Sequence, residues 1–204
     1  MKRLFILLVL GLAGFSAGAE TPAILVFGDS ISAGYGLTHV ETGWVETLRA
    51  KLKAEGYGYQ VVNASVSGET TAGGLARLPR ALSLHHPQIV IIELGGNDGL
   101  RALAVAQMRA NLNQMVNLSS SAGAKVLLLG MRIPPNYGPE YTEQFRVSFA
   151  DVAQRNKVPL VPFLLQGIAL TPGLVQADGI HPNELGQPIL LANVWPSLKP
   201  LLKK

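Results

Sequence analysis

The sequence predicts an α/β fold in which helices cover both faces of a parallel β-sheet. Short β-rich runs alternate with helical stretches along the chain from residue 23 onward. The strand runs are almost entirely apolar, which is typical of strands buried on both faces. Short polar segments follow several of these runs, and open α/β sheets bind their ligands beyond the carboxyl ends of the strands.

Five segments have the length and composition of buried strands. The run QIVIIEL at residues 88–94 is the clearest of them. The five expected strands cover residues 23–27, 60–64, 88–94, 125–130 and 158–161.

Helical periodicity separates these strands. Trp44, Leu48 and Leu52, for example, are spaced to share one helix face. Pro79 predicts a kink or break, because proline lacks the backbone N–H of a helix interior, and Gly123 is in the usual position after a helix end. The expected helices cover residues 43–55, 71–84, 102–122, 141–156 and 186–202.

The N-terminus has the layout of a secretory signal peptide. Lys2 and Arg3 precede an apolar run over residues 4–12, and small residues follow at 17–19. The alternative is a retained membrane anchor, but the run is shorter than the roughly 20 residues that a span needs. We therefore expect a signal peptide at 1–19, one domain at 20–204, export to the periplasm or the medium, and no stable membrane anchor after cleavage.

Charge and cysteine content exclude several classes of function. The chain has 17 basic and 13 acidic residues, and the basic ones form no stripe or run, so we expect no nucleic-acid partner. The absence of cysteine excludes disulfides, thiolate metal sites and a lipid-modified N-terminus. Neither observation determines the oligomeric state.

The first strand ends in Gly28-Asp29-Ser30, which places a hydroxyl at the carboxyl edge of the sheet. Serine is a weak nucleophile and needs a base within hydrogen-bond reach. Taken alone, this tripeptide is more typical of a turn that caps a helix.

Asp178-Gly179-Ile180-His181 can supply that base. A tight turn at Gly179 would direct the Asp178 carboxylate at Nδ1 of His181, leaving Nε2 free to accept a proton. A metal pair or a capped turn are the alternatives. Because no third ligand stands at a convincing spacing, we expect no metal.

Two further segments offer hydrogen-bond donors at the same edge. Gly95-Gly96-Asn97-Asp98 follows the third strand, and Asn97 carries a side-chain amide; turn or cap chemistry is the alternative. Gly68 follows the second strand and can present a bare N–H, although an ordinary loop explains it as well. Together the four segments supply a nucleophile, a base, an orienting acid and oxyanion donors.

These four segments resemble the sequence blocks of the GDSL, or SGNH, hydrolase family. Residues 27–30 are similar to the first block, Gly68 to the second, residues 95–98 to the third and residues 178–181 to the fifth. One departure is visible, since Ile31 stands where the family has the leucine of its name. Residues 28–35, 95–100, 135–138 and 178–183 look closest to the periplasmic arylesterase, acyl-CoA thioesterase and lysophospholipase branch.

The resemblance implies a three-layer α/β/α sandwich with five parallel strands, in a flavodoxin-like arrangement. It implies Ser30 as the nucleophile, His181 as the base and Asp178 as its orienting acid. The backbone N–H groups of Ser30 and Gly68 and the Asn97 side chain would form the oxyanion hole. Residues 99–104 resemble a mobile loop beside the acyl groove. The substrate-binding residues that the resemblance implies are Asp29, Gly96, Leu100, Arg132, Pro135 and Tyr137.

The implied activity is hydrolysis of carboxylic esters, and of acyl thioesters or lysophospholipids, without a cofactor. The partner is then a small acyl ester or thioester. A carbohydrate acetyl esterase would use the same residues. A non-catalytic flavodoxin-like binding module could share the sheet order, but a carboxylate stands where it would need a phosphate-binding loop. An inactive adhesion or scaffold relative is the third alternative, and the intact catalytic set is evidence against it.

Overall fold

A computed structural model of the chain describes residues 21–204. The expected signal peptide, residues 1–19, lies outside this part of the chain. Among the described residues, no helix combines the length and hydrophobicity of a membrane span.

Five parallel strands form one sheet in the order β2-β1-β3-β4-β5. This confirms the predicted parallel sheet. Several strands end one or two residues short of the expected bounds, while β1 extends one residue farther, to Gly28. The five strands are β1 (Ala23–Gly28), β2 (Gln60–Asn63), β3 (Ile89–Glu93), β4 (Lys125–Leu129) and β5 (Leu160–Val161).

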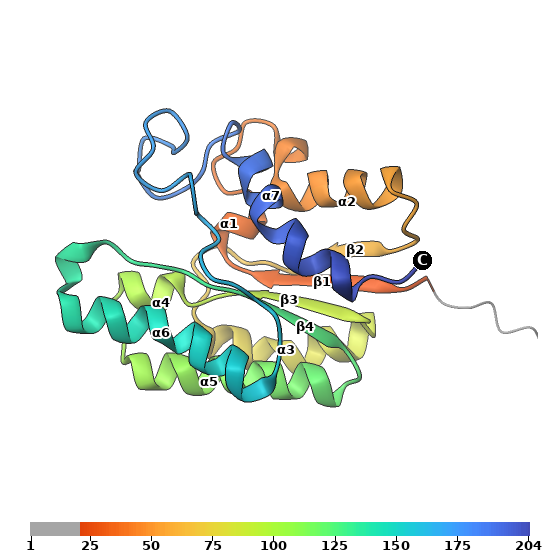
Figure 1. The fold of residues 1–204 in the computed structure, drawn as a ribbon, viewed down its shortest axis with the longest axis horizontal. Coiled ribbons are helices and arrows are strands. Elements are labelled where there is room, and N and C mark those ends of the chain that lie inside the picture. Colours follow the sequence, from red (N-terminus) through yellow and green to blue (C-terminus); the bar gives the residue numbers. More distant parts are fainter. Residues whose placement is uncertain (1–20) are drawn as a thin grey trace, which may run out of the picture.

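Helices lie on both faces of the sheet, as Figure 1 shows. One face carries α1 (Ser30–Ala33), α2 (Trp44–Ala54) and α7 (Gln187–Leu198), and the other carries α3 (Thr71–His85), α4 (Gly96–Leu100), α5 (Val105–Ser121) and α6 (Pro139–Asn156). Short 3₁₀ turns occur at Val40–Thr42, Pro135–Tyr137 and Lys199–Leu201. The three-layer α/β/α sandwich is therefore confirmed.

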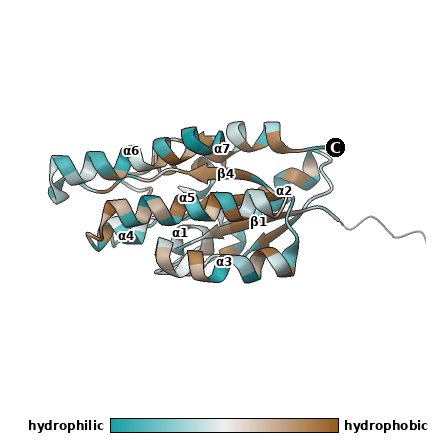
Figure 2. Ribbon diagram, turned by 90° about the horizontal axis from the view of Figure 1, so that it is seen from below, coloured by the Kyte–Doolittle hydropathy of each residue, from teal (hydrophilic) through white to brown (hydrophobic). Residues whose placement is uncertain are grey.

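The core lies between the sheet and these helices, and the apolar colour of β1 and β4 is visible edge-on in Figure 2. All six residues of β1 and all five of β3 are buried. Trp44, Leu48 and Leu52 are fully buried on one face of α2, as their spacing predicted.

Three helix predictions need correction. The helix expected over 102–122 begins only at Val105, because Ala102 has a positive φ of 50° and separates α5 from the unexpected short helix α4. The helix expected to reach residue 202 ends at Leu198 and continues as a 3₁₀ turn, since Pro200 lacks the N–H that another α-helical turn would use. α3 runs continuously through Pro79, so the predicted break does not occur, while a kink there stays a prediction.

The strand order places a topological switch point between β1 and β3. The chain goes from β1 to β2 on one side and then crosses to β3 on the other side of β1. In open α/β sheets the ligand binds in the crevice that opens at such a point. The segments that follow β1 and β3 begin at Asp29 and Leu94, so they carry Ser30 and Asn97 to this crevice.

Candidate active site

Ser30 is the first residue of the short helix α1, directly after β1. The Asp29 side chain caps this helix, because its Oδ1 accepts the backbone N–H of Ile31 at 3.1 Å. The capping interpretation of Gly-Asp-Ser is thus correct for Asp29, while Ser30 remains half-buried and directed at the pocket.

The structure brings Ser30, His181 and Asp178 into one hydrogen-bonded chain. Nε2 of His181 lies 2.8 Å from Oγ of Ser30, and Nδ1 of His181 lies 2.6 Å from Oδ2 of Asp178. This is the arrangement in which a carboxylate holds the imidazole so that its other nitrogen can accept a hydroxyl proton.

Backbone hydrogen bonds hold the Asp178 carboxylate in place. Its Oδ1 accepts the N–H groups of Ile180 at 2.9 Å and His181 at 3.0 Å, across a turn in which Gly179 has a φ of +70°. Desolvation alone would raise the pKa of Asp178, but these hydrogen bonds and the one from the His181 ring outweigh it and lower the pKa to about 2. The carboxylate is therefore ionised wherever an imidazolium could form beside it.

Two residues that the sequence analysis did not assign support His181. The Tyr35 ring lies with its centroid 4.8 Å from that of the His181 ring. Nε2 of Gln176 donates to the carbonyl oxygens of Tyr35 at 2.8 Å and Pro182 at 3.1 Å, which joins α1's exit to the histidine segment. No local pattern marks Gln176, because its partner Tyr35 is 141 residues away.

Asn97 and Gly68 lie at the same pocket as Ser30. Nδ2 of Asn97 donates one hydrogen to Oδ2 of Asp29 at 3.1 Å, which leaves its second hydrogen available. Gly68 has a φ of +78°, which glycine adopts without strain. Within residues 21–204, the backbone N–H groups of Ser30 and Gly68 donate to no other group.

Asp98 connects the segments of Asn97 and Gly68. Its two carboxylate oxygens accept the backbone N–H of Thr71 at 2.8 Å and the Thr71 hydroxyl at 2.6 Å. Asn111 on α5 donates to the same hydroxyl oxygen at 3.0 Å. These hydrogen bonds anchor α4, which carries Asp98, to the first residue of α3. The buried carboxyl group also lies at the N-terminus of α3, where the helix dipole favours negative charge.

A second buried carboxyl, Glu93, lies beneath the Ser30 motif. Its Oε2 accepts the backbone N–H of Asp29 at 3.2 Å and the hydroxyl of Ser32 at 2.7 Å. A Cβ at Gly28 would lie 2.5 Å from that oxygen, so only glycine fits there. A lone acid in the apolar run of β3 was the available sequence signal, but the sequence analysis did not interpret it.

Burial changes the titration of both carboxyls. Desolvation, and then the charge of Asp29, raises the pKa of Glu93 well above its usual range. Desolvation also raises the pKa of Asp29, to about 6, against the opposing hydrogen bonds from Ile31 and Asn97. The neutral form of Glu93 is therefore favoured in the fold, while Asp29, with its pKa at about 6, is mostly ionised at pH 7 and can hold the Asn97 amide.

The pocket around these residues has a volume of about 610 Å³, which lies in the usual range for small-molecule sites. Of the expected substrate-binding residues, five line it, namely Asp29, Gly96, Leu100, Arg132 and Pro135. Other apolar lining residues are Ile31, Met131, Ile133, Pro134, Phe163, Leu165, Ala169, Leu170 and Ile180.

Tyr137 does not line the pocket. Its hydroxyl instead donates to the carbonyl oxygen of Leu100 at 2.7 Å, and the Tyr141 hydroxyl donates to that of Leu103 at 2.7 Å. The two rings stack with centroids 6.3 Å apart. Both hydrogen bonds link the tyrosine pair to the segment at residues 99–104, and the mobility of this segment stays a prediction.

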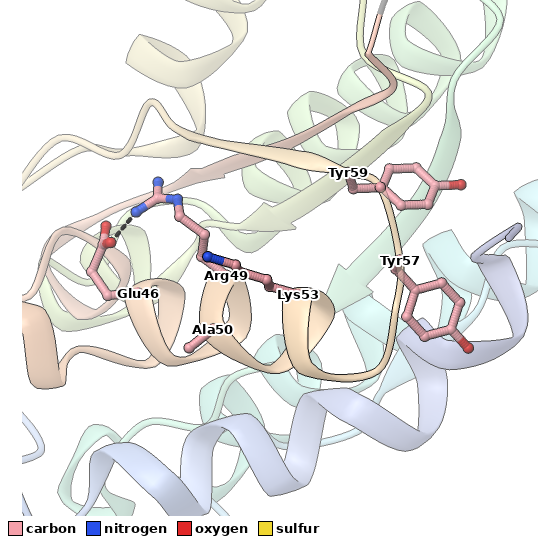
Figure 3. A pocket seen from close by; sticks show the side chains of 7 residues that line it. Glu46, Arg49, Ala50, Lys53, Tyr57 and Tyr59 are labelled. Carbon is pink, nitrogen blue, oxygen red and sulfur yellow. Dashed lines mark hydrogen bonds and ion pairs between the residues drawn. The ribbon is translucent and has the colours of Figure 1, made fainter.

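A second hollow, shown in Figure 3, lies between α2 and the residues that precede β2. It has a volume of about 420 Å³ and is lined by Arg49, Lys53, Tyr57 and Tyr59 among others. Arg49 is already paired with Glu46 and donates to a backbone carbonyl of β2. Unlike the pocket at Ser30, the hollow has no serine, histidine or aspartate among its lining residues.

Comparisons with known proteins agree with this geometry. Residues 26–189 match the GDSL-like Lipase/Acylhydrolase family. Esterase TesA of Pseudomonas aeruginosa is 52% identical over 99% of this chain and 100% of its own length. Thioesterase 1/protease 1/lysophospholipase L1 of Escherichia coli K12 is 41% identical over 97% of this chain and 92% of its own length.

Solved structures show the same fold. The psychrotrophic esterase EstA from Pseudoalteromonas sp., in a structure inhibited by monoethylphosphonate, superimposes with a TM-score of 0.83 at 42% identity. The match covers 87% of this chain and 97% of the EstA chain. The chain therefore belongs to the GDSL-like lipase/acylhydrolase family.

Proposed function

We propose that this protein is a serine ester hydrolase in which Ser30 is the nucleophile, His181 the general base and Asp178 the group that orients it. The continuous hydrogen-bonded chain from the Ser30 hydroxyl through the His181 ring to Asp178 carries the proposal. The family membership and the names of the relatives, an esterase and a thioesterase/lysophospholipase, support the same class of reaction.

In the proposed reaction, His181 accepts the Ser30 proton while Oγ attacks the acyl carbonyl carbon. The tetrahedral intermediate collapses with loss of the alcohol or thiol, which takes the proton from His181. Water, deprotonated by the same imidazole, then attacks the acyl-enzyme and releases the acid with Ser30 regenerated. Asp178 remains ionised throughout and stabilises the imidazolium.

The oxyanion would be held by three donors at this pocket. They are the backbone N–H groups of Ser30 and Gly68 and the second amide hydrogen of Asn97. All three are unpaired within the described chain, as preorganised donors must be before substrate binds. Removal of one such donor lowers kcat by about 10²- to 10³-fold in comparable sites.

The apolar lining of the pocket favours an aliphatic acyl group over a sugar. Leu100, Met131 and Ile133 present hydrocarbon surface beside the reacting serine. We therefore propose carboxylic esters as substrates, together with acyl thioesters or lysophospholipids whose acyl portion fills the same space.

The direct test compares Ser30→Ala with the unmodified protein on p-nitrophenyl esters and acyl-CoAs of two to sixteen carbons. Ser83→Ala, an exposed serine on α3, is the matched control. We expect Ser30→Ala to lose turnover and fluorophosphonate labelling while circular dichroism stays unchanged, and Ser83→Ala to keep both. Wild-type turnover by Ser30→Ala would overturn the assignment.

We also propose that the protein is exported and that residues 1–19 are removed. Support comes from the charged and apolar pattern of the N-terminal sequence. Intact mass spectrometry of the periplasmic fraction should give a chain that begins at Glu20. A chain that still begins at Met1 in the membrane fraction would contradict this.

A further inference from the structure

Leu170 has an unusual backbone conformation in the segment between β5 and α7, which projects beyond the sheet in Figure 1. The N–H of Thr171 donates to the carbonyl oxygen of Ile168 at 2.9 Å and closes a four-residue turn. Leu170 is the third residue of this turn and has a φ of +63°. Turns that need a positive φ at this position usually have glycine or asparagine there, because a Cβ crowds the backbone in that region.

The other non-glycine residues of 21–204 with positive φ have local reasons for it. His86 and Lys157 are the C-caps of α3 and α6, where a left-handed residue ends a helix. Ala102 follows α4 and has only a methyl side chain. Within this described part of the chain, Leu170 is the one large apolar residue in this conformation.

The chain that leads into the turn is held in place. Ile168 and Leu164 are fully buried. Nδ2 of Asn193, on α7, donates to the carbonyl oxygens of Leu164 at 2.9 Å and Gln166 at 2.8 Å. A strained residue persists where its surroundings determine the backbone in this way, and such residues cluster at ligand sites.

Nothing in the core explains why this position is a leucine. Leu170 is 93% exposed, the highest value among the exposed large apolar side chains of the described residues. It nevertheless lines the same pocket as Ser30 and His181, together with Phe163 and Leu165 from the same segment. Leu170 thus extends the apolar wall from the interior of the pocket to its mouth.

We propose that Leu170 contacts the distal carbons of a bound acyl chain and sets the preference of the enzyme for long chains. This inference rests on the proposed ester hydrolase function. An acyl group with its carbonyl at Ser30 fills the inner pocket first, and only a long chain reaches the mouth. Contact there removes both hydrocarbon surfaces from water.

The test measures the ratio of kcat/KM for p-nitrophenyl dodecanoate to that for the butyrate, below the concentration at which either substrate aggregates. Leu170→Asn keeps a residue that tolerates positive φ and removes the apolar surface. We expect the ratio to fall about three- to tenfold. In an enclosed pocket the loss of one methylene contact lowers kcat/KM by about tenfold or more, and the effect should be smaller at the exposed mouth.

Two control variants sharpen this comparison. Leu170→Met keeps an apolar side chain and should preserve most of the ratio. Leu185→Asn changes a leucine that is 68% exposed but does not line the pocket, and should leave the ratio at the wild-type value. An unchanged ratio in Leu170→Asn would overturn the proposal. A fall that appears only with aggregated substrate would also overturn it, because Leu170 would then contact a lipid surface instead of a single acyl chain.

A binding measurement separates this proposal from the hydrolase function. Calorimetric titration of dodecanoate and butyrate into Ser30→Ala, with and without Leu170→Asn, needs no turnover. We expect Leu170→Asn to weaken dodecanoate binding about three- to tenfold more than butyrate binding. If wild type cleaved no ester, the proposed hydrolase function would be wrong. The titration would still show whether Leu170 contacts a long acyl chain. Equal affinities with and without the substitution would refute that role.

Discussion

Replacement of Glu93 by glutamine should lower the free energy of unfolding at acid pH, and this cost should shrink as pH rises. Glu93 is fully buried, and its pKa in the folded protein is raised well above that of an unfolded glutamate, near 4.5, by desolvation and the nearby Asp29 charge. The contribution of neutral Glu93 to the free energy of unfolding is therefore fully present below pH 4.5. It is lost as pH rises from there through the pKa of Glu93 in the folded protein.

The size of this effect follows from one proton. Between pH 4.5 and the raised pKa of Glu93, the folded state retains a proton that the unfolded state releases. The free energy of unfolding then falls by about 1.4 kcal/mol per pH unit. As pH rises above 4.5 the wild type should therefore lose stability that Glu93→Gln retains, since glutamine cannot ionise.

The amide has a constant cost of its own. Its oxygen can accept the Asp29 N–H and the Ser32 hydroxyl, as Oε2 of Glu93 does now. Its NH₂ group would occupy the position of Oε1, which has no hydrogen-bond partner in the described chain. An unsatisfied buried donor costs about 1–3 kcal/mol. The amide has one more hydrogen to satisfy at this position than the protonated carboxyl, so the variant should be less stable than wild type at pH 4.

Urea unfolding followed by circular dichroism at pH 4, 5, 6, 7 and 8 measures both effects. The pH 4 comparison is the internal control, because the side chain is then neutral in both proteins. The stability difference should shift in favour of the variant as pH rises. Parallel stability curves over this whole range would mean that Glu93 is already ionised in the folded state, and would refute the reasoning.

Three further substitutions test the site and its supports. Asp178→Asn should lower kcat by about 10⁴-fold at unchanged fold, because the amide favours the wrong imidazole tautomer; a loss below tenfold in an ester assay would contradict the orienting role. Asp98→Asn should lower the free energy of unfolding by about 2–4 kcal/mol, since it removes a buried acceptor at the N-terminus of α3. An unchanged free energy in urea unfolding would show that the hydrogen bonds between Asp98 and Thr71 add no stability. Gly74→Ala should destabilise by about 1–3 kcal/mol, because a Cβ there would lie 2.4 Å from a core leucine methyl. Gly58→Ala, with nothing within 4 Å, is its control in thermal unfolding and should stay at the wild-type Tm.

The candidate site could be predicted largely because its residues follow strands. Apolar runs located β1 and β3, and parallel strands bring their carboxyl ends to one edge, so Ser30 and Asn97 were expected to converge. His181 was recognisable from Asp178 three residues earlier, since a turn is a local structure. The role of Tyr137 differed, because its contact with Leu100 spans 37 residues and leaves no local pattern.

The amino-acid sequence by itself determined the alternation of strands and helices, the apolar core positions and the short motifs that carry reactive groups. These features depend on residues within a few positions of each other, where periodicity and turn chemistry act. Only the tertiary structure decided the strand order, the placement of Glu93 against Gly28, the packing of Tyr35 on His181 and the exposure of Leu170 at the pocket mouth. Each of these depends on desolvation or contact between distant segments, which no local pattern records.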